Sequence, residues 1–400
     1  MARAPRFVAL RNRDFRIFWF GQLISLSGTW MQSVAQGWLV YSLTKSPFYL
    51  GLVAAAGTLP ILLFTLAGGI VADRFRKRNL LLATQALSII PAIALGILTH
   101  AQMITVWEVA LFAAFLGTVN AFDVPARQSF IVEMVGKGHL TNAIALNSAA
   151  FHGARMIGPV IAGLTIASVG LPACFFLNAL SFLAVIIALL RLRTRGESAM
   201  TSNSMVEDLL DGLRYMKKQS NIFHLIILIA IFSLIGMPFM TLLPIFAGEV
   251  FHQGPEGFGA MVGATGAGAL LAALSLAWRD DIEDKMRFLT LSALSFSILL
   301  LVFSFVSHFI IAIGLLIFIG WSLVSFFAVA NSYIQLSVPD NLRGRAMSVY
   351  SFVFLGTAPI GNSIIGTAAD AVGTTITIAV VAVVCLITSV LFCRKQCNIG

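Results

Sequence analysis

The chain contains a series of apolar stretches, each long enough to cross a membrane as a helix. Only 11% of its 400 residues are charged and 58% are hydrophobic, whereas soluble domains carry about 25% charged residues. A membrane span needs roughly 20 apolar residues. Twelve stretches meet this requirement: Ile17–Tyr41, Phe48–Ala72, Leu80–Leu98, Ile104–Val124, Ala143–Ser168, Ala173–Leu190, Ile222–Ala247, Gly257–Ala277, Phe288–Val306, Phe309–Val329, Met347–Ala368 and Thr374–Cys393. They are too long and continuous for barrel strands, so we expect an all-α membrane protein with twelve transmembrane helices.

The basic residues predict which ends of these helices face the cytoplasm. With the N-terminus inside, 24 of the 26 Lys and Arg residues fall in cytoplasmic segments; Lys45 lies in an outer loop and Arg155 within a span. Cytoplasmic loops attract the excess of bases, so both termini are expected in the cytoplasm of a bacterial inner membrane. The net charge of +9 then reflects orientation and attraction to anionic headgroups, and nucleic acid is not an expected partner.

A polar linker and an internal repeat divide the chain into two bundles of six helices. Residues 191–220 form the longest polar stretch, with apolar residues at helical spacing over 206–216 that predict a surface helix. The flanking domains are 1–190 and 221–400. Segment 128–135 resembles segment 331–338, 203 residues later, and the same offset pairs Gly163 with Gly366.

The loop between spans 2 and 3 has the sequence Gly69-Ile-Val-Ala-Asp73-Arg74-Phe-Arg76-Lys77-Arg78. It resembles the loop 2–3 signature of the major facilitator superfamily, with Arg76 where that family usually has Gly. The resemblance implies a fold of two six-helix bundles and a gate in which Asp73 meets a helix N-terminus of the other bundle, where a carboxylate is favoured. The expected gating residues are Gly69, Asp73, Arg74, Lys77, Arg78, Arg343 and Arg345. The alternative is that the bases only set orientation.

Span 5 carries Gly158, Pro159 and Gly163 in a sequence that resembles the antiporter motif of the same superfamily. Proline bends a helix, and small residues allow close approach of a neighbouring helix. The resemblance implies export, whereas the alternative is ordinary helix packing.

Several further segments resemble one branch of the superfamily, the enterobactin exporters or transmembrane secretion effectors. These segments are 15–22, 120–128, 142–147 and 211–215, so the resemblance is dense over the first 220 residues. It implies an exported siderophore, drug or lipid-like compound as substrate and makes Asn120 a candidate substrate-binding residue.

Arg155 lies near the middle of span 5, where a charged residue is costly and is a functional candidate. Its partner is expected to be Asp123 or Glu108, the acids within span 4. One interpretation is functional: Arg155 binds an anionic group of the substrate, or a proton on Asp123 competes with the pairing. The other is a permanent structural ion pair.

Span 1 carries a polar stripe at steps of three and four residues, which places its members on one helix face. Its members are Gln22, Ser25, Thr29, Gln32 and Gln36. Because polar groups facing lipid are costly, the stripe faces either a cavity, where it would contact substrate, or another helix. The expected substrate-binding residues are Gln22, Thr29, Gln32, Gln36, Asn120 and Arg155.

The sequence lacks a nucleotide-binding P-loop, a catalytic constellation and metal-ligand spacing of Cys or His. We therefore expect no enzyme, cofactor or metal site. The family resemblance implies a monomeric secondary active exporter of small amphipathic molecules in the lipid bilayer. Proton-coupled antiport is the expected drive, with Asp123 and Glu108 as coupling candidates. A proton-coupled importer and a non-transporting receptor or assembly module are the alternatives.

Overall fold

The computed structural model describes residues 8–194, 213–214, 216–217, 219–278, 282 and 284–397. The surface helix expected in the linker lies outside these residues, apart from three of its positions. The first half of the chain forms α1 (Arg13–Thr44), α2 (Pro47–Arg74), α3 (Lys77–His100), α4 (Val106–Val135), α5 (Leu140–Ser168) and α6 (Leu171–Arg191). The second half forms α8 (Ser220–Ile231), α9 (Leu243–Ile245), α10 (Pro255–Trp278), α11 (Lys285–Phe305), α12 (Phe309–Ser337), α13 (Asp340–Gly356), α14 (Ala358–Val372) and α15 (Thr374–Cys397).

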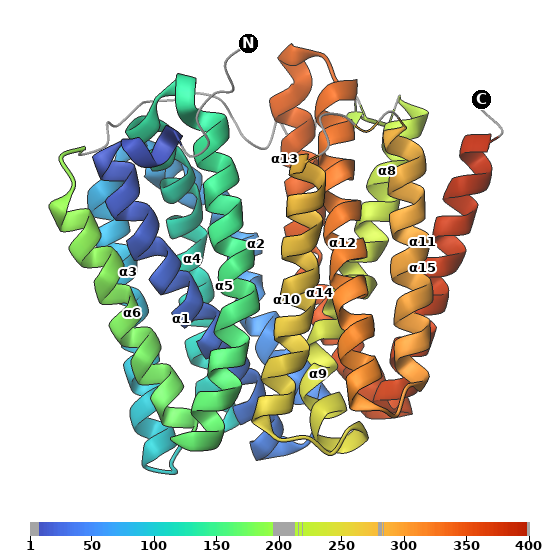
Figure 1. Cartoon of the computed structure of the whole chain (residues 1–400), viewed down its shortest axis with the longest axis horizontal. Coiled ribbons are helices and arrows are strands. Elements are labelled where there is room, and N and C mark those ends of the chain that lie inside the picture. Colours follow the sequence, from blue (N-terminus) through green and yellow to red (C-terminus); the bar gives the residue numbers. More distant parts are fainter. Residues whose placement is uncertain are drawn as a thin grey trace. The chain divides into compact units, whose positions relative to one another are not determined.

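The described residues form two compact units. The first lies within Met1–Leu43, Ala56–Thr201 and Gly254–Gly263; the second lies within Thr44–Ala55, Ser202–Gln253 and Ala264–Gly400. The first unit therefore includes the start of α10, and the second includes the start of α2. In each unit the long helices run side by side (Figure 1).

Eleven helical segments among the described residues are long and apolar enough to cross a membrane. α1 is not among them although it has 32 residues, because Gln22, Gln32 and Gln36 make it more polar than the others. The expected all-α membrane fold is confirmed. Several boundaries differ, the most at α4, which continues to Val135, about 16 Å at ~1.5 Å per residue beyond the expected end of span 4. The equivalent helix of the second half, α12, likewise continues past Val329 to Ser337.

The two halves repeat one packing pattern. α4 and α12 begin at Val106 and Phe309, 203 residues apart, and α6 and α15 begin at Leu171 and Thr374 with the same separation. α3 packs against α4 and α6, while α11 packs against α12 and α15. The separation equals the repeat offset found in the sequence, so each half builds the same bundle.

The segment after α8 departs from regular α-helix. A π-helical turn at η3 (Phe232–Gly236) is followed by a 3-10 turn at η4 (Met237–Leu242), by α9 and by a second π-helical turn at η5 (Phe246–Val250). Pro238 has no N–H to donate to the carbonyl of Leu234 one turn earlier. Gly361 of α14 lies against that carbonyl: a Cβ atom at Gly361 would be only 2.0 Å from the oxygen.

Buried aromatic residues and hydrogen bonds stabilise the first unit near the start of α1. Phe18 and Phe130 meet edge to face with their ring centroids 6.0 Å apart. The carboxylate of Asp14 accepts hydrogen bonds from the backbone N–H groups of Arg193 and Thr194 at 3.0 and 2.9 Å. These bonds satisfy N–H groups just beyond α6 and attach its end to α1.

Candidate functional site

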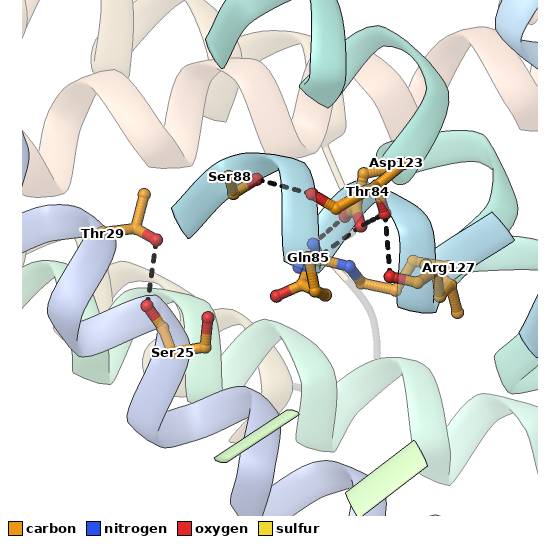
Figure 2. A network of polar contacts seen from close by, with 8 residues as sticks. Ser25, Thr29, Thr84, Gln85, Ser88, Asp123 and Arg127 are labelled. Carbon is orange, nitrogen blue, oxygen red and sulfur yellow. Dashed lines mark hydrogen bonds and ion pairs between the residues drawn. The ribbon is translucent and has the colours of Figure 1, made fainter. Parts of the chain in front are cut away.

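The first unit contains a buried carboxylate surrounded by donors from two helices (Figure 2). The side chain of Asp123 on α4 is 1% exposed. Its Oδ1 accepts hydrogen bonds from Thr84 Oγ1 at 2.7 Å and Gln85 Nε2 at 2.9 Å, both on α3. Its Oδ2 forms an ion pair with Nη2 of Arg127, one helical turn further along α4.

The carboxylate of Asp123 meets the requirement that a buried charge be paired and hydrogen-bonded. Thr84 Oγ1 also lies 3.0 Å from Leu81 O, and Ser88 Oγ donates to Thr84 O at 2.9 Å. The Arg127 side chain is 19% exposed, so the pair reaches toward the edge of the unit. Protonation of Asp123 would remove the charge that holds Arg127, which makes this pair a candidate charge switch.

The expected pairing of Arg155 with Asp123 or Glu108 is wrong. Asp123 forms its ion pair with Arg127 instead. The sequence predicts Arg127 to lie in the loop after span 4, but α4 continues through this residue and brings it one turn from Asp123. Glu108 is one of the first residues of α4, where its carboxylate accepts the N–H of Thr105 at 2.7 Å in a capping box.

Arg155 instead lies over an aromatic ring. Its guanidinium carbon is 5.4 Å from the ring centroid of Trp30 on α1, a distance at which the cation is attracted by the ring. Trp30 meets Phe151 edge to face at 5.7 Å. Arg155 is 7% exposed, and His152, one turn earlier on α5, has a buried Nδ1 with no hydrogen bond to the described residues. The guanidinium group of Arg155 thus lies against the Trp30 ring between α1 and α5, and the imidazole of His152 lies one turn from Arg155 on α5.

Some side chains of the polar stripe on α1 form hydrogen bonds with other helix residues, whereas Gln22 Oε1 forms none with the described residues. Gln32 faces α6, where its Oε1 accepts a hydrogen bond from Asn178 Nδ2 at 2.7 Å. Thr29 Oγ1 donates to Ser25 O within α1 at 2.9 Å. These contacts are those of helix packing. Gln22 is 3% exposed and its Oε1 has no hydrogen-bond partner among the described residues.

The remaining two candidates of the first half are less enclosed. Gln36 and Asn120 are both half-buried. Their roles as substrate-binding residues stay predictions.

The glycines of the antiporter-like motif lie at close helix contacts within the first unit. A Cβ atom at Gly158 would be 2.7 Å from Ser27 O on α1. One at Gly163 would be 2.8 Å from Glu256 Cα, and one at Gly259 would be 2.4 Å from Pro159 O. α5 and the first turns of α10 therefore touch backbone to backbone.

The second unit contains the matching contact. A Cβ atom at Gly51 of α2 would be 2.4 Å from Asn362 O and 2.8 Å from Gly366 Cα on α14. Gly366 stands 203 residues after Gly163, so the two contacts occupy equivalent places in the repeat. The sequence repeat flagged Gly366, but only the structure identifies Gly51 and Gly259 as the opposing surfaces.

Two of the loop 2–3 bases are engaged inside the first unit. Lys77 Nζ forms an ion pair with Glu133 Oε1 at 2.6 Å. Arg78 donates from Nε to Leu189 O at 2.7 Å and from Nη2 to Leu190 O at 3.0 Å, which caps the end of α6. Both bases therefore stabilise the packing of helices within the first unit.

The other expected gating residues lie at helix ends. Gly69 and Asp73 are half-buried near the end of α2, and Arg74 closes that helix. In the second unit, Arg343 Nε donates to Gln335 O at 3.0 Å, and Arg345 lies in the same helix, α13. The contact expected between Asp73 and α13 would join the two units and stays a prediction.

Polar and aromatic side chains in the interior of the second unit are engaged in packing. Phe326 is fully buried, with its ring centroid 4.6 Å from that of Phe232, and Ser322 Oγ lies 3.0 Å from Ser295 Oγ. The hydrogen bond from Thr241 Oγ1 to Asn362 Oδ1, at 3.0 Å, was missed from the sequence. The described residues hold no group of three or more His, Cys, Asp or Glu side chains that could bind a metal ion.

Comparisons with known proteins agree with this architecture. The family model described as "Transmembrane secretion effector" matches residues 4–399. The chain is 25% identical to the staphyloferrin A transporter of Staphylococcus aureus, over 94% of this chain and 95% of that one. It is 26% identical to the multidrug efflux pump Tap of Mycolicibacterium fortuitum, with 88% of each chain covered.

Solved structures of low sequence identity share the fold. A peptide transporter of the POT type superposes with a TM-score of 0.77 at 14% identity, over 96% of this chain and 94% of the other. A bacterial homologue of the iron transporter ferroportin gives a TM-score of 0.70 at 14% identity, over 95% and 98%. The chain therefore belongs to the transmembrane secretion effector family of the major facilitator superfamily and is a membrane transporter rather than an enzyme.

Proposed function

We propose that the protein exports small amphipathic molecules, of the siderophore, drug or lipid-like class, across the bacterial plasma membrane. The names of its relatives support export, since they include a multidrug efflux pump and a macrolide efflux protein of Streptococcus pyogenes. The staphyloferrin A transporter supports a polar, siderophore-type substrate. Both termini face the cytoplasm in this proposal, as the distribution of bases favours.

The observation that carries the proposal is the group formed by Arg155, Trp30 and His152. A cation on a ring face, beside a buried imidazole nitrogen with no hydrogen bond to the described residues, suits a substrate that has both an anionic group and an apolar surface. Such polar groups at membrane depth mark substrate pathways. Gln22 offers a further buried acceptor on α1.

The two glycine contacts are the helix contacts that would separate and re-form during transport. α5 meets α10 through Gly163 and Gly259, and α2 meets α14 through Gly51 and Gly366. Each contact joins helices from opposite halves of the chain. Alternating access requires such contacts to form in one state and separate in the other, and a glycine surface separates without disrupting side-chain packing.

The Asp123–Arg127 pair is the proposed site of proton coupling. A proton taken up by Asp123 would cancel its charge and release Arg127, while Thr84 and Gln85 keep the acid in place. Glu108 is a weaker candidate because its carboxylate is used in a helix cap. The alternative functions, import or a receptor without transport, share the fold but predict different fluxes.

The test is transport by the purified protein in proteoliposomes. A panel of fluorescent amphipathic compounds and anionic siderophores would be assayed under an imposed pH gradient, with empty vesicles as the baseline. We expect gradient-dependent flux of at least one compound, and a selective loss for anionic compounds in Arg155→Gln. Flux equal to that of empty vesicles across the panel would contradict transport, and flux in the direction of proton flow would establish import.

A further inference from the structure

A groove lies where α2 ends and α3 begins. Its volume is about 740 Å³, and it is lined by Val71, Arg74, Phe75, Arg76, Asn79, Leu80 and Ala83, all in the first unit. The lining thus combines two guanidinium groups and an amide with an apolar wall. Arg74 is one of the expected gating residues, but the proposed transport function assigns no ligand to the groove.

The four bases of this turn divide into two pairs. Lys77 and Arg78 are bound to Glu133 and to the carbonyls at the end of α6. Arg74 and Arg76 are exposed, and neither side chain forms a hydrogen bond or ion pair within the part of the chain that the structure describes. Two cations therefore line the groove with their donors available to a ligand.

The backbone does not explain why an arginine stands at position 76. The superfamily signature that this loop resembles has glycine there, but Arg76 has φ −61° and ψ 115°, a conformation open to any residue. The turn therefore does not need glycine. The arginine adds a second cation close to Arg74, which a glycine would not supply.

The apolar part of the groove is exposed as well. The Phe75 side chain, between the two arginines in sequence, is 59% exposed. An exposed phenylalanine at the end of a membrane helix can bury its ring at the boundary between headgroups and acyl chains. A free phosphate would use the guanidinium groups alone, whereas a phospholipid would also cover Phe75 and the wall formed by Leu80 and Ala83.

We infer that this groove binds the headgroup of an anionic phospholipid of the cytoplasmic leaflet. The phosphate lies between Arg74 and Arg76, Asn79 donates to the glycerol region, and an acyl chain follows Phe75 into the bilayer. Anionic lipids are enriched on the cytoplasmic side, where basic pockets between helices recognise them. The inference rests on the proposed orientation and not on what the protein transports.

The experiment measures lipid binding to the purified protein in detergent. Retention of dioleoyl phosphatidylglycerol and dioleoyl phosphatidylcholine would be quantified by native mass spectrometry for wild type and for Arg74→Gln/Arg76→Gln. The matched control is Arg191→Gln/Arg193→Gln, which removes two exposed charges beside the end of α6 in the same unit. We expect the groove variant to lose about 30-fold in affinity for phosphatidylglycerol, or roughly 5-fold per base, and the control to match wild type.

Two additional measurements distinguish binding of a phospholipid from binding of other anions. Glycerol 3-phosphate, which lacks acyl chains, is expected not to displace the bound lipid at millimolar concentration, and Phe75→Ala is expected to weaken retention several-fold. If the double variant does not fold, Arg76→Gln alone is expected to lose about 5-fold. Equal losses in the groove and control variants, or displacement by glycerol 3-phosphate, would overturn the inference.

Discussion

Removing either member of the Asp123–Arg127 pair should destabilise the protein far more than removing both. In Asp123→Asn, the amide still accepts from Thr84 and Gln85 through its oxygen, but its NH₂ group then faces the donors of Arg127. Breaking a buried ion pair by removing one partner costs about 3–5 kcal/mol. We expect about 3 kcal/mol here, because the Arg127 side chain is 19% exposed and regains part of its hydration.

Arg127→Gln leaves the carboxylate of Asp123, 1% exposed, without its counter-charge. We again expect a loss of about 3 kcal/mol at pH 7. This loss should shrink as the pH falls, since a protonated Asp123 no longer leaves an unpaired charge in the bundle. Asp123→Asn should show no such pH dependence.

The double variant Asp123→Asn/Arg127→Gln carries two neutral amides that can hydrogen-bond to each other. The coupling free energy from the double-mutant cycle should therefore be at least about 2 kcal/mol. Reversible unfolding in mixed micelles measures all four proteins. Glu108→Gln is the matched control, an acid of the same helix whose replacement affects only the capping box at the start of α4. Single-variant losses that add to within about 0.5 kcal/mol would refute the pairing argument.

Three further perturbations test two helix contacts and the turn between α2 and α3. Gly163→Ala should block the approach of α10, whose atoms would lie 2.8 Å from the new Cβ, and lower transport at least tenfold. The control Gly153→Ala, where the new Cβ has no atom within 4 Å, should leave transport intact. Equal effects of the two substitutions on transport would contradict the contact. Asn178→Leu removes the hydrogen bond to Gln32 and should cost about 0.6–2 kcal/mol of stability with KM unchanged, and a large rise in KM would instead place Gln32 at the substrate. Arg76→Gly should leave the thermal unfolding temperature in lipid-free detergent within about 2 °C of wild type, because the turn is accessible to all residues, and a larger change would show a structural role.

The fold could be predicted because bilayer physics leaves few choices. Apolar length, basic loops and a repeat offset of 203 residues each have a direct structural counterpart. The break after α8 was missed, although Pro238 and Pro244 signal it, because a proline in an apolar stretch does not reveal whether the helix bends or unwinds. The end of span 4 was placed too early because Pro125 and Arg127 are typical of a loop.

The candidate site was predicted less completely than the fold. Arg155 could be singled out from its cost at membrane depth, but its aromatic neighbour Trp30 follows only from how α1 and α5 pack. Likewise, the polar stripe could be placed on one helix face, but periodicity alone does not say which member meets another helix. The structure answers that for Gln32 through Asn178.

The most direct test of the account follows proton and substrate movement together in the same proteoliposomes. Wild type should move an anionic amphipathic compound against proton flow, with the two fluxes rising and falling together as the pH gradient is varied. Asp123→Asn should lose this gradient-driven flux while keeping substrate exchange in the absence of a gradient, since the Arg155 and Trp30 site is unchanged. Gradient-driven antiport at the wild-type rate in a folded Asp123→Asn protein would contradict proton coupling through the Asp123–Arg127 pair.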